Sequence, residues 1–297
     1  RDRVFEEAEK AFKDGDDQWA AELTAYLVRI DREDVPARQL KAAALRRIGY
    51  ATANTNWRGF YLTAARELDG LLQPEDIGRL LDCMREFGGM VTTRKAREGH
   101  DKPYEINIAL FDALKGTLAG GPDNLGIDRF VCAHAIMLAL EGIPALYIHS
   151  LLGTENDTAR VEHTGRARSI NRHIWQEGEL YAALEDDGRH HKEVFERLTR
   201  LIGLRGRQPA FHPNATQFTM HLGTEIFAFW RQSMDRRQSI FCIYNVTRES
   251  RSVNLSDINL VGTELWKDLI GDVLYEDQAG EIELAPYQSV WLTNRFD

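Results

Sequence analysis

Nine residues in the middle of the chain, 165–173, bring together side chains that can bind an anion. They include three arginines, an asparagine and a histidine: Arg166, Arg168, Asn171, Arg172 and His173. A guanidinium group is planar and permanently charged, and its donors fit two oxygens of a phosphate or carboxylate at once. This composition indicates a site for an anionic substrate or acceptor group.

A second interpretation of the same residues stays open. The three arginines could instead form ion pairs that hold the loop, with nearby acids as partners: Glu155, Asp157 and Glu162. Asn171 and His173 are interpreted as fixing the loop backbone. His190 and His191 are interpreted as the start of a surface helix rather than as metal ligands.

The segment before the arginines is predicted to be a buried strand. Residues 143–149 are mostly apolar, and a polar loop separates them from the cluster. In an α/β barrel, substrate-binding side chains lie on the loops that follow the strands. The order of elements therefore suits a site at the end of a barrel strand.

Charge and composition argue against several classes of function. The chain has 297 residues and a formal net charge of -9, which disfavours general binding to nucleic acid or anionic membrane. No apolar run approaches the ~20 residues of a membrane span. Cys83, Cys132 and Cys242 lack the close spacing of a zinc site and are expected to be reduced, mostly buried thiols. We expect a cytoplasmic protein without a metal or cofactor.

Residues 1–69 are predicted to form helical hairpins. Apolar residues recur at helical spacing, Pro36 is placed to open the third helix, and Asn54 is placed to cap the fourth. Arg58 is expected in an ion pair. The aromatic residues expected in the core between the helices are Trp19, Tyr26, Trp57 and Tyr61.

The rest of the chain changes pattern twice. Between residues 70 and 213 we predict helices at 74–87, 128–140 and 193–204, with a long polar loop at 90–126. After residue 214 the apolar period becomes two, which predicts a small antiparallel β-domain. Its predicted strands are 218–221, 226–230, 239–246, 252–255 and 289–292.

The second part of the chain resembles a family of sugar phosphorylases. The order "GIPALYIHSLLG", then "ND", then "GRARSINRH", is similar to sucrose phosphorylase and its relatives in the α-amylase superfamily. "DRFVCAHAIMLALEGIPALYIHSL" resembles the last helix and strand of their barrel, and "DKPYEINIALFDAL" resembles their mobile acceptor-site loop. The Pro103-Tyr104-Glu105 variant is closer to phosphorylases of glucosylglycerate-type substrates.

This resemblance implies a site without its catalytic groups. Such enzymes retain anomeric configuration through a carboxylate nucleophile and a nearby carboxylic acid. In the family these groups, and a third Asp, lie upstream of the matched region, so we predict no catalytic residue in this chain. Glu105, Asp112, Glu155 and Asp157 are candidates by residue type alone and are interpreted as loop acids or helix caps. The residues predicted to bind substrate or phosphate are Tyr104, Glu105, Arg166, Arg168 and Asn171.

The first part of the chain resembles a different family. Residues 15–27 and the motif "NWRGFYLT" at 56–63 are similar to the helical dimerisation domain of alkylsulfatases of the metallo-β-lactamase type. Those enzymes bind zinc through a His-x-His-x-Asp-His cluster in a separate domain, and that spacing does not occur among the nine histidines here. The resemblance implies an association module and no metal site.

Together these features predict a mixed fold in three parts. An all-α helical-hairpin module covers 1–69, the end of a (β/α)8 barrel covers 70–213, and an antiparallel β-domain covers 214–297. The first functional hypothesis is a retaining glycoside phosphorylase portion, inactive alone, with weak affinity for phosphate or a glucosyl sugar. The alternatives are a homodimerising association module, or a fusion without its own catalytic function. Whether another chain supplies the missing barrel strands stays open.

Overall fold

The fold comes from a computed structural model that describes residues 1–72, 74–95, 99, 101–258, 265–276 and 280–295. Its contacts divide the chain into two compact units, Arg1–Leu80 and Leu81–Asp297. The predicted three-part division, with boundaries at 69/70 and 213/214, stays a prediction. In the part of the chain that the structure describes, every helix is too short or too polar to cross a lipid bilayer.

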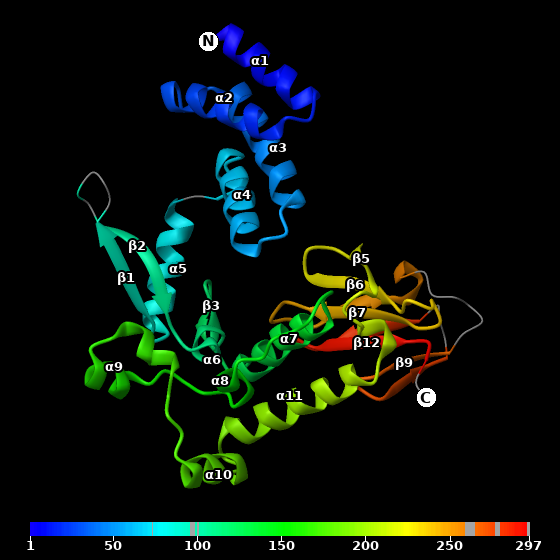
Figure 1. The fold of residues 1–297 in the computed structure, drawn as a ribbon. Coiled ribbons are helices and arrows are strands. Elements are labelled where there is room, and N and C mark those ends of the chain that lie inside the picture. Colours follow the sequence, from blue (N-terminus) through cyan, green and yellow to red (C-terminus); the bar gives the residue numbers. More distant parts are fainter. Residues whose placement is uncertain (73, 96–98, 100, 259–264, 277–279, 296–297) are drawn as a thin grey trace. The chain divides into compact units, whose positions relative to one another are not determined.

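The first unit is helical, as predicted. Its helices are α1 (Asp2–Lys13), α2 (Asp17–Ile30), α3 (Val35–Ala51) and α4 (Thr55–Leu68), followed by the start of α5 (Figure 1). Pro36 lies in the first turn of α3, and the Asn54 side chain accepts a hydrogen bond from the Trp57 amide at 3.1 Å. Both helix starts that were predicted from these residues are confirmed. The Asn54 cap stabilises the start of α4 because it bonds an amide that has no partner inside the helix.

The expected aromatic core of this unit is wrong for three of its residues. Trp19, Tyr26 and Trp57 are 42%, 51% and 59% exposed. The fully buried side chains of these helices are small: Ala8, Ala20, Ala37, Ala42, Ala44 and Ala65. Beside them lie three buried leucines, Leu23, Leu27 and Leu45. Small residues let the helices approach closely, and the large rings lie at the edge of the packed region. Arg58 does not form the expected ion pair in the described chain, and its guanidinium lies 6.0 Å from the centre of the Tyr50 ring.

The second unit begins within α5, and a β-hairpin, helices and short turns precede its C-terminal sheet. They are α5 (Pro74–Glu86), β1 (Met90–Lys95), β2 (Asp101–Asn107), α6 (Leu110–Ala113), β3 (Gly116–Thr117), β4 (Gly121–Pro122), α7 (Gly126–Ala139), α8 (Ile148–Leu151), α9 (Thr158–Thr164), the 3-10 turn η1 (Ala167–Asn171), α10 (Glu177–Glu185), α11 (His190–Gly206) and the 3-10 turn η2 (Pro209–Phe211). Part of the predicted loop 90–126 is therefore regular. β1 and β2 pair antiparallel, with Val91 opposite Ile106 and a register shift between Thr92 and Thr93.

The predicted strand at 143–149 is wrong. Residues 143–147 have no strand partner in the described chain, and α8 begins at Ile148. Ile143, expected inside, is 84% exposed. A parallel strand needs neighbours to satisfy its backbone, and the described chain offers none here. The preceding helix is tied to the β-domain instead, because the buried Arg231 donates to the Ala139 carbonyl at 2.6 Å.

The C-terminal β-domain confirms the period-two pattern. Its elements are β5 (Thr216–His221), β6 (Ile226–Gln232), β7 (Ser239–Asn245), β8 (Arg251–Asn254), the 3-10 turn η3 (Leu255–Ile258), β9 (Trp266–Asp268), β10 (Val273–Tyr275), β11 (Glu281–Leu284) and β12 (Ser289–Thr293). Six of these strands form an antiparallel sheet in the order β10-β9-β12-β7-β6-β5. The sequence missed the short strands β9, β10 and β11.

The six-stranded sheet is covered on both faces. One face carries Phe229, Tyr244 and Trp291 and packs on α7 and α11, which run beneath the sheet in Figure 1. The other face carries Phe241 and Ile243 and packs on β8, β11 and η3. The helices before the sheet and the sheet itself therefore share one core, and the arginine cluster lies on loops attached to that framework.

Candidate functional site

The arginine-bearing loop closes on itself. Asp157 caps α9 by accepting a hydrogen bond from the Arg160 amide at 2.7 Å. Gly165 ends that helix with φ of 66°, a left-handed conformation that suits glycine. The Asp157 amide donates to the Ile170 carbonyl at 2.7 Å, which joins the start of α9 to η1. Two short helical segments thereby hold the arginines of 160–172 in a fixed arrangement.

One ion pair joins this loop to the β-hairpin. Nε of Arg168 lies 3.0 Å from Oε2 of Glu105 on β2. The hydrogen bond from Arg168 is the main reason that the pKa of Glu105 lies below its usual value. The alternative interpretation proposed other partners for Arg168, namely Glu155, Asp157 or Glu162. The structure pairs it with Glu105 instead.

A hollow of about 690 Å³ opens between the hairpin and the loop. We call it the arginine hollow, and its lining residues are Thr92, Glu105, Asn107, Arg160, His163, Thr164, Arg166, Ala167, Arg168, Ser169 and Arg172. Four arginines and one glutamate give the lining a net charge of +3 when His163 is neutral. Within the described chain, no carboxylate lies within 4 Å of the guanidinium of Arg166 or Arg172. The hollow therefore has more positive charge than its own acids balance.

Two buried donors of the lining lack hydrogen bonds of normal geometry within the described chain. They are Nε of Arg160 and Nδ2 of Asn107, which lies close enough to Glu105 to help lower the pKa of that carboxyl. A buried polar atom without a partner is costly, so such atoms commonly mark a place where a ligand or water completes the bonding. The two atoms lie on opposite walls of the hollow, because Arg160 belongs to α9 and Asn107 belongs to β2.

The structure gathers only part of the predicted binding set. Glu105, Arg166 and Arg168 line the hollow together. Tyr104 does not line the hollow; the guanidinium of Arg94 lies over its ring, 3.4 Å from the ring centre. Asn171 is absent from the lining as well.

Asn171 and His173 act within the loop. The Asn171 carbonyl accepts a hydrogen bond from the Tyr147 hydroxyl at 3.0 Å, and Nδ1 of His173 lies 2.7 Å from Oδ2 of Asp157. Burial acts to raise the pKa of Asp157, but the hydrogen bonds from His173 and the Arg160 amide outweigh it and the net pKa is lowered. The interpretation of these two residues as fixing the loop is consistent with these contacts.

Sequence reasoning missed one wall of the hollow. Arg160, His163 and Thr164 lie three and four residues apart on α9, so they share one face of that helix. The sequence does contain a signal for this helix, because Asp157 is a residue type that caps helix starts. No helix was predicted at 158–164, so the common face of these three residues was not recognised.

The other candidate acids have structural partners. Asp112 is buried, accepts the Asn156 amide at 2.6 Å and lies 3.2 Å from the Lys115 ammonium. Asp157 is the cap described above. The interpretation as a loop acid or helix cap is confirmed for Asp157. It is wrong for Asp112, which lies buried within α6 and accepts a backbone amide from a distant loop.

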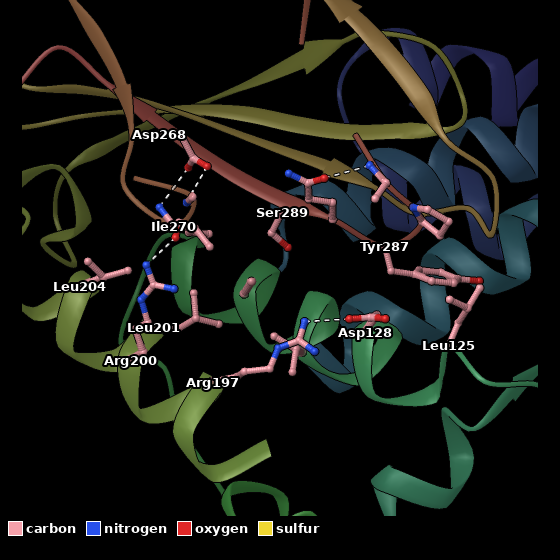
Figure 2. Close-up of a pocket in the computed structure, with 16 residues that line it drawn as sticks. Leu125, Asp128, Arg197, Arg200, Leu201, Leu204, Asp268, Ile270, Tyr287 and Ser289 are labelled. Carbon is pink, nitrogen blue, oxygen red and sulfur yellow. Dashed lines mark hydrogen bonds and ion pairs between the residues drawn. The ribbon is translucent and has the colours of Figure 1, made fainter. Parts of the chain in front are cut away.

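Figure 2 shows a second hollow, of about 320 Å³, between α7, α11 and the sheet. Its polar groups bond to one another: Arg197 pairs with Asp128 at 2.9 Å, and Arg200 donates to the Ile270 carbonyl at 2.6 Å. Burial raises the pKa of Asp268, although three backbone amides donate to its carboxyl. None of the predicted binding residues lines this hollow, which lies along the seam between helices and sheet.

Comparison with known proteins divides the chain into the same two regions as the sequence patterns. Residues 1–70 match the family model for alkyl sulfatase dimerisation. A linear primary-alkylsulfatase from Pseudomonas is 51% identical over 73 residues, which cover 25% of this chain and 14% of that protein. A glucosylglycerate phosphorylase from Allomeiothermus silvanus is 35% identical over 223 residues, which cover 75% of this chain and 37% of that protein. The chain carries two separate resemblances.

The resemblances predicted from sequence are confirmed for both regions. The chain spans well under half the length of the phosphorylases that it matches. Among solved structures, sucrose 6F-phosphate phosphorylase from Thermoanaerobacter thermosaccharolyticum aligns with a TM-score of 0.48 and 24% identity, over 60% of this chain and 33% of that one.

Proposed function

We propose that the arginine hollow binds inorganic phosphate or the phosphate group of a sugar phosphate. The observation that carries the proposal is the excess of positive charge in the hollow, four arginines against the single carboxylate of Glu105. A phosphate matches this excess of positive charge, because each guanidinium group can bind two of its oxygens. The similarity of residues beyond the helical module to glucosylglycerate phosphorylases supports phosphate as the anion.

Binding requires an exchange of partners at Arg168. In the structure this side chain pairs with Glu105, so an incoming phosphate competes with that carboxylate for the guanidinium. The pair is partly exposed, and ion pairs near the surface contribute little to stability, so the exchange is easily reversed. Arg160, Arg166 and Arg172 supply the additional charge that favours the phosphate.

We further propose that this chain does not turn over a glucoside by itself. A retaining mechanism needs two carboxyls about 5 Å apart on either side of the bound sugar. Glu105, Asp112 and Asp157 are engaged in ion pairs, a helix cap and backbone hydrogen bonds. The matched region of the relatives is also less than half of their length, which supports a portion rather than a complete enzyme.

The test is to titrate the full chain with inorganic phosphate and to measure binding by calorimetry and stability by thermal unfolding. We expect saturable binding and a rise in melting temperature, since a ligand that binds only the folded state stabilises it. Arg166→Ala and Arg168→Ala should each weaken binding about tenfold, whereas Arg237→Ala, an exposed arginine outside the hollow, should not. Equal affinity in all four proteins would refute the site.

Turnover is tested separately. Purified chain at high concentration is incubated with phosphate and either sucrose or glucosylglycerate, and glucose 1-phosphate is measured. We expect no product above the buffer background. Product formation that Arg168→Ala abolishes would refute the second proposal and show that carboxylates of this chain had taken over the chemistry.

A second candidate function, self-association, rests on the first unit. Its surface exposes several large apolar side chains: Trp19, Tyr26, Ile30, Val35, Tyr50, Trp57 and Phe60. Trp57 lies 6.2 Å from Tyr61 and 6.5 Å from Phe60 between ring centres, so α4 carries a cluster of rings. Together with the match to the alkyl sulfatase dimerisation family, this surface supports a homodimer formed through residues 1–70.

A further inference from the structure

The start of α11 holds two neighbouring imidazoles against one loop. Nε2 of His190 lies 2.8 Å from the Gly153 carbonyl, and Nδ1 of His191 lies 2.8 Å from the Leu152 carbonyl. His191 is buried, which differs from the expectation that both histidines lie on a surface helix. The loop before the arginine cluster is therefore fastened to α11 through two consecutive carbonyls.

These contacts decide which nitrogen of each ring carries the proton. A nitrogen beside a carbonyl oxygen must donate, so the other nitrogen of each neutral ring carries a lone pair. That leaves Nδ1 of His190 and Nε2 of His191 as acceptors. Within the described chain, neither acceptor nitrogen has a hydrogen-bond donor. A histidine that binds a metal commonly donates its other N–H to a backbone carbonyl in this way.

A carboxylate completes the cluster. One possible ligand atom from each of Glu155, His190 and His191 lies within 4.8 Å of the other two. Ligands about 2.0–2.1 Å from a tetrahedral zinc ion lie about 3.3 Å apart, so the three atoms would have to approach by at most about 1.5 Å. Glu155 is exposed, so its carboxylate can move toward the histidines by changing its rotamer.

The surroundings hold the two rings in place. His190 stacks on Phe111 with 4.2 Å between ring centres, and Trp175 meets His191 edge to face at 5.3 Å. Gly153 has φ of 58°, and a Cβ atom there would lie 3.2 Å from His190 Cδ2. The loop can approach the histidines this closely because residue 153 has no side chain.

The charges around the rings act in both directions. Arg189 is a positive charge near His191 and opposes a cation there, whereas the carboxylate of Glu155 favours one. Glu155 is the negatively charged member of the cluster.

We propose that Glu155, His190 and His191 bind a divalent transition metal ion of the zinc type, with water in the remaining position. Two imidazoles and one carboxylate form a donor set that such ions accept. The ion would join the loop at 152–155 to the first turn of α11. It would thereby stabilise the segment that leads into the arginine hollow. This proposal departs from the sequence prediction of no metal ligand.

The probe is Zn²⁺ added to the full chain after treatment with a chelator. Calorimetry should give one ion per chain with micromolar or tighter affinity, and the melting temperature should rise with Zn²⁺ concentration. Co²⁺ in place of Zn²⁺ should give the visible absorption of a tetrahedral nitrogen and oxygen site. Glu155→Gln and His190→Ala should each weaken Zn²⁺ binding at least about tenfold.

The matched control is His221→Ala, which removes an exposed histidine from β5. Its Zn²⁺ affinity should equal that of the unmodified chain. His191→Ala risks misfolding because His191 is buried, so the decision rests on Glu155→Gln, which alters only an exposed carboxylate. Absence of Zn²⁺ binding by the unmodified chain, or equal affinity in Glu155→Gln and His221→Ala, would overturn the proposal.

Discussion

At the scale of single residues, Glu105 limits how well the hollow holds an anion. Its carboxylate occupies Arg168 and is the single negative charge of the lining. We predict that Glu105→Gln binds inorganic phosphate about two- to fivefold more tightly, because an ion pair near the surface is weak and its loss frees Arg168 for the phosphate. Calorimetric titration of both proteins measures the ratio, and unchanged or weaker binding by the variant would contradict the competition between carboxylate and phosphate.

The pH dependence of that ratio follows from the lowered pKa of Glu105. A carboxyl whose pKa is lower in the folded state stabilises the fold above its unfolded pKa of about 4.3. The stabilisation is lost as the pH falls through the folded value. The advantage of Glu105→Gln should therefore be full at neutral pH and should vanish below the pKa of the native carboxyl, where both side chains are neutral.

The residues of the hollow were predictable only in part. Arg166 and Arg168 were predicted from their residue type. That they share a site with Glu105 was predicted from the resemblance to phosphorylases. Tyr104 was placed in the same site, yet it is the residue of β2 without a partner at the register shift, and its ring packs on Arg94. Such an irregularity could be recognised only once the pairing of residues 101–107 was known.

At the scale of elements, the segment 143–147 lacks the strand that its apolar sequence predicted. None of its amides donates a backbone hydrogen bond in the described chain. We predict that the amides of Ile143, Ala145, Leu146 and Tyr147 exchange with deuterium as fast as those of an exposed loop. Amides of α7 and β7, which lie in the shared core, should be protected and serve as the internal control. Slow exchange at 143–147 would show that another strand, from this chain or a second copy, pairs with it.

Elements with local causes were predicted well and elements with distant causes were not. Helix caps such as Asn54 act on residues three positions away, and alternation in β5, β6 and β7 reports one buried face directly. A parallel strand at 143–149 depends on neighbours that no local pattern can supply. The β1–β2 hairpin was missed because its polar, glycine-containing stretch has few apolar residues, although Val91 and Ile106 do pair.

At the scale of the whole molecule, each compact unit has a separate basis for stability. The helical unit is filled by alanines and leaves its large rings on the surface, whereas the second unit buries Trp266 and Trp291 within its sheet. Exposed rings that cluster on a small helical unit are typical of an association surface. The second unit also exposes rings, such as Phe218 and Phe227, but both faces of its sheet are covered within the unit.

This contrast predicts that self-association depends on α4. Replacing Trp57 by Ser and Phe60 by Asp together places a charge and removes apolar area where a second copy would pack, without disturbing the buried alanines. We expect light scattering after gel filtration to give twice the monomer mass for the unmodified chain and the monomer mass for the double variant. The control is Met234→Ser, which changes a 64% exposed apolar residue in the second unit and should leave the mass unchanged. A monomeric unmodified chain would contradict self-association. A dimer that survives the double variant would place the association surface away from α4, whose exposed rings would then have another role.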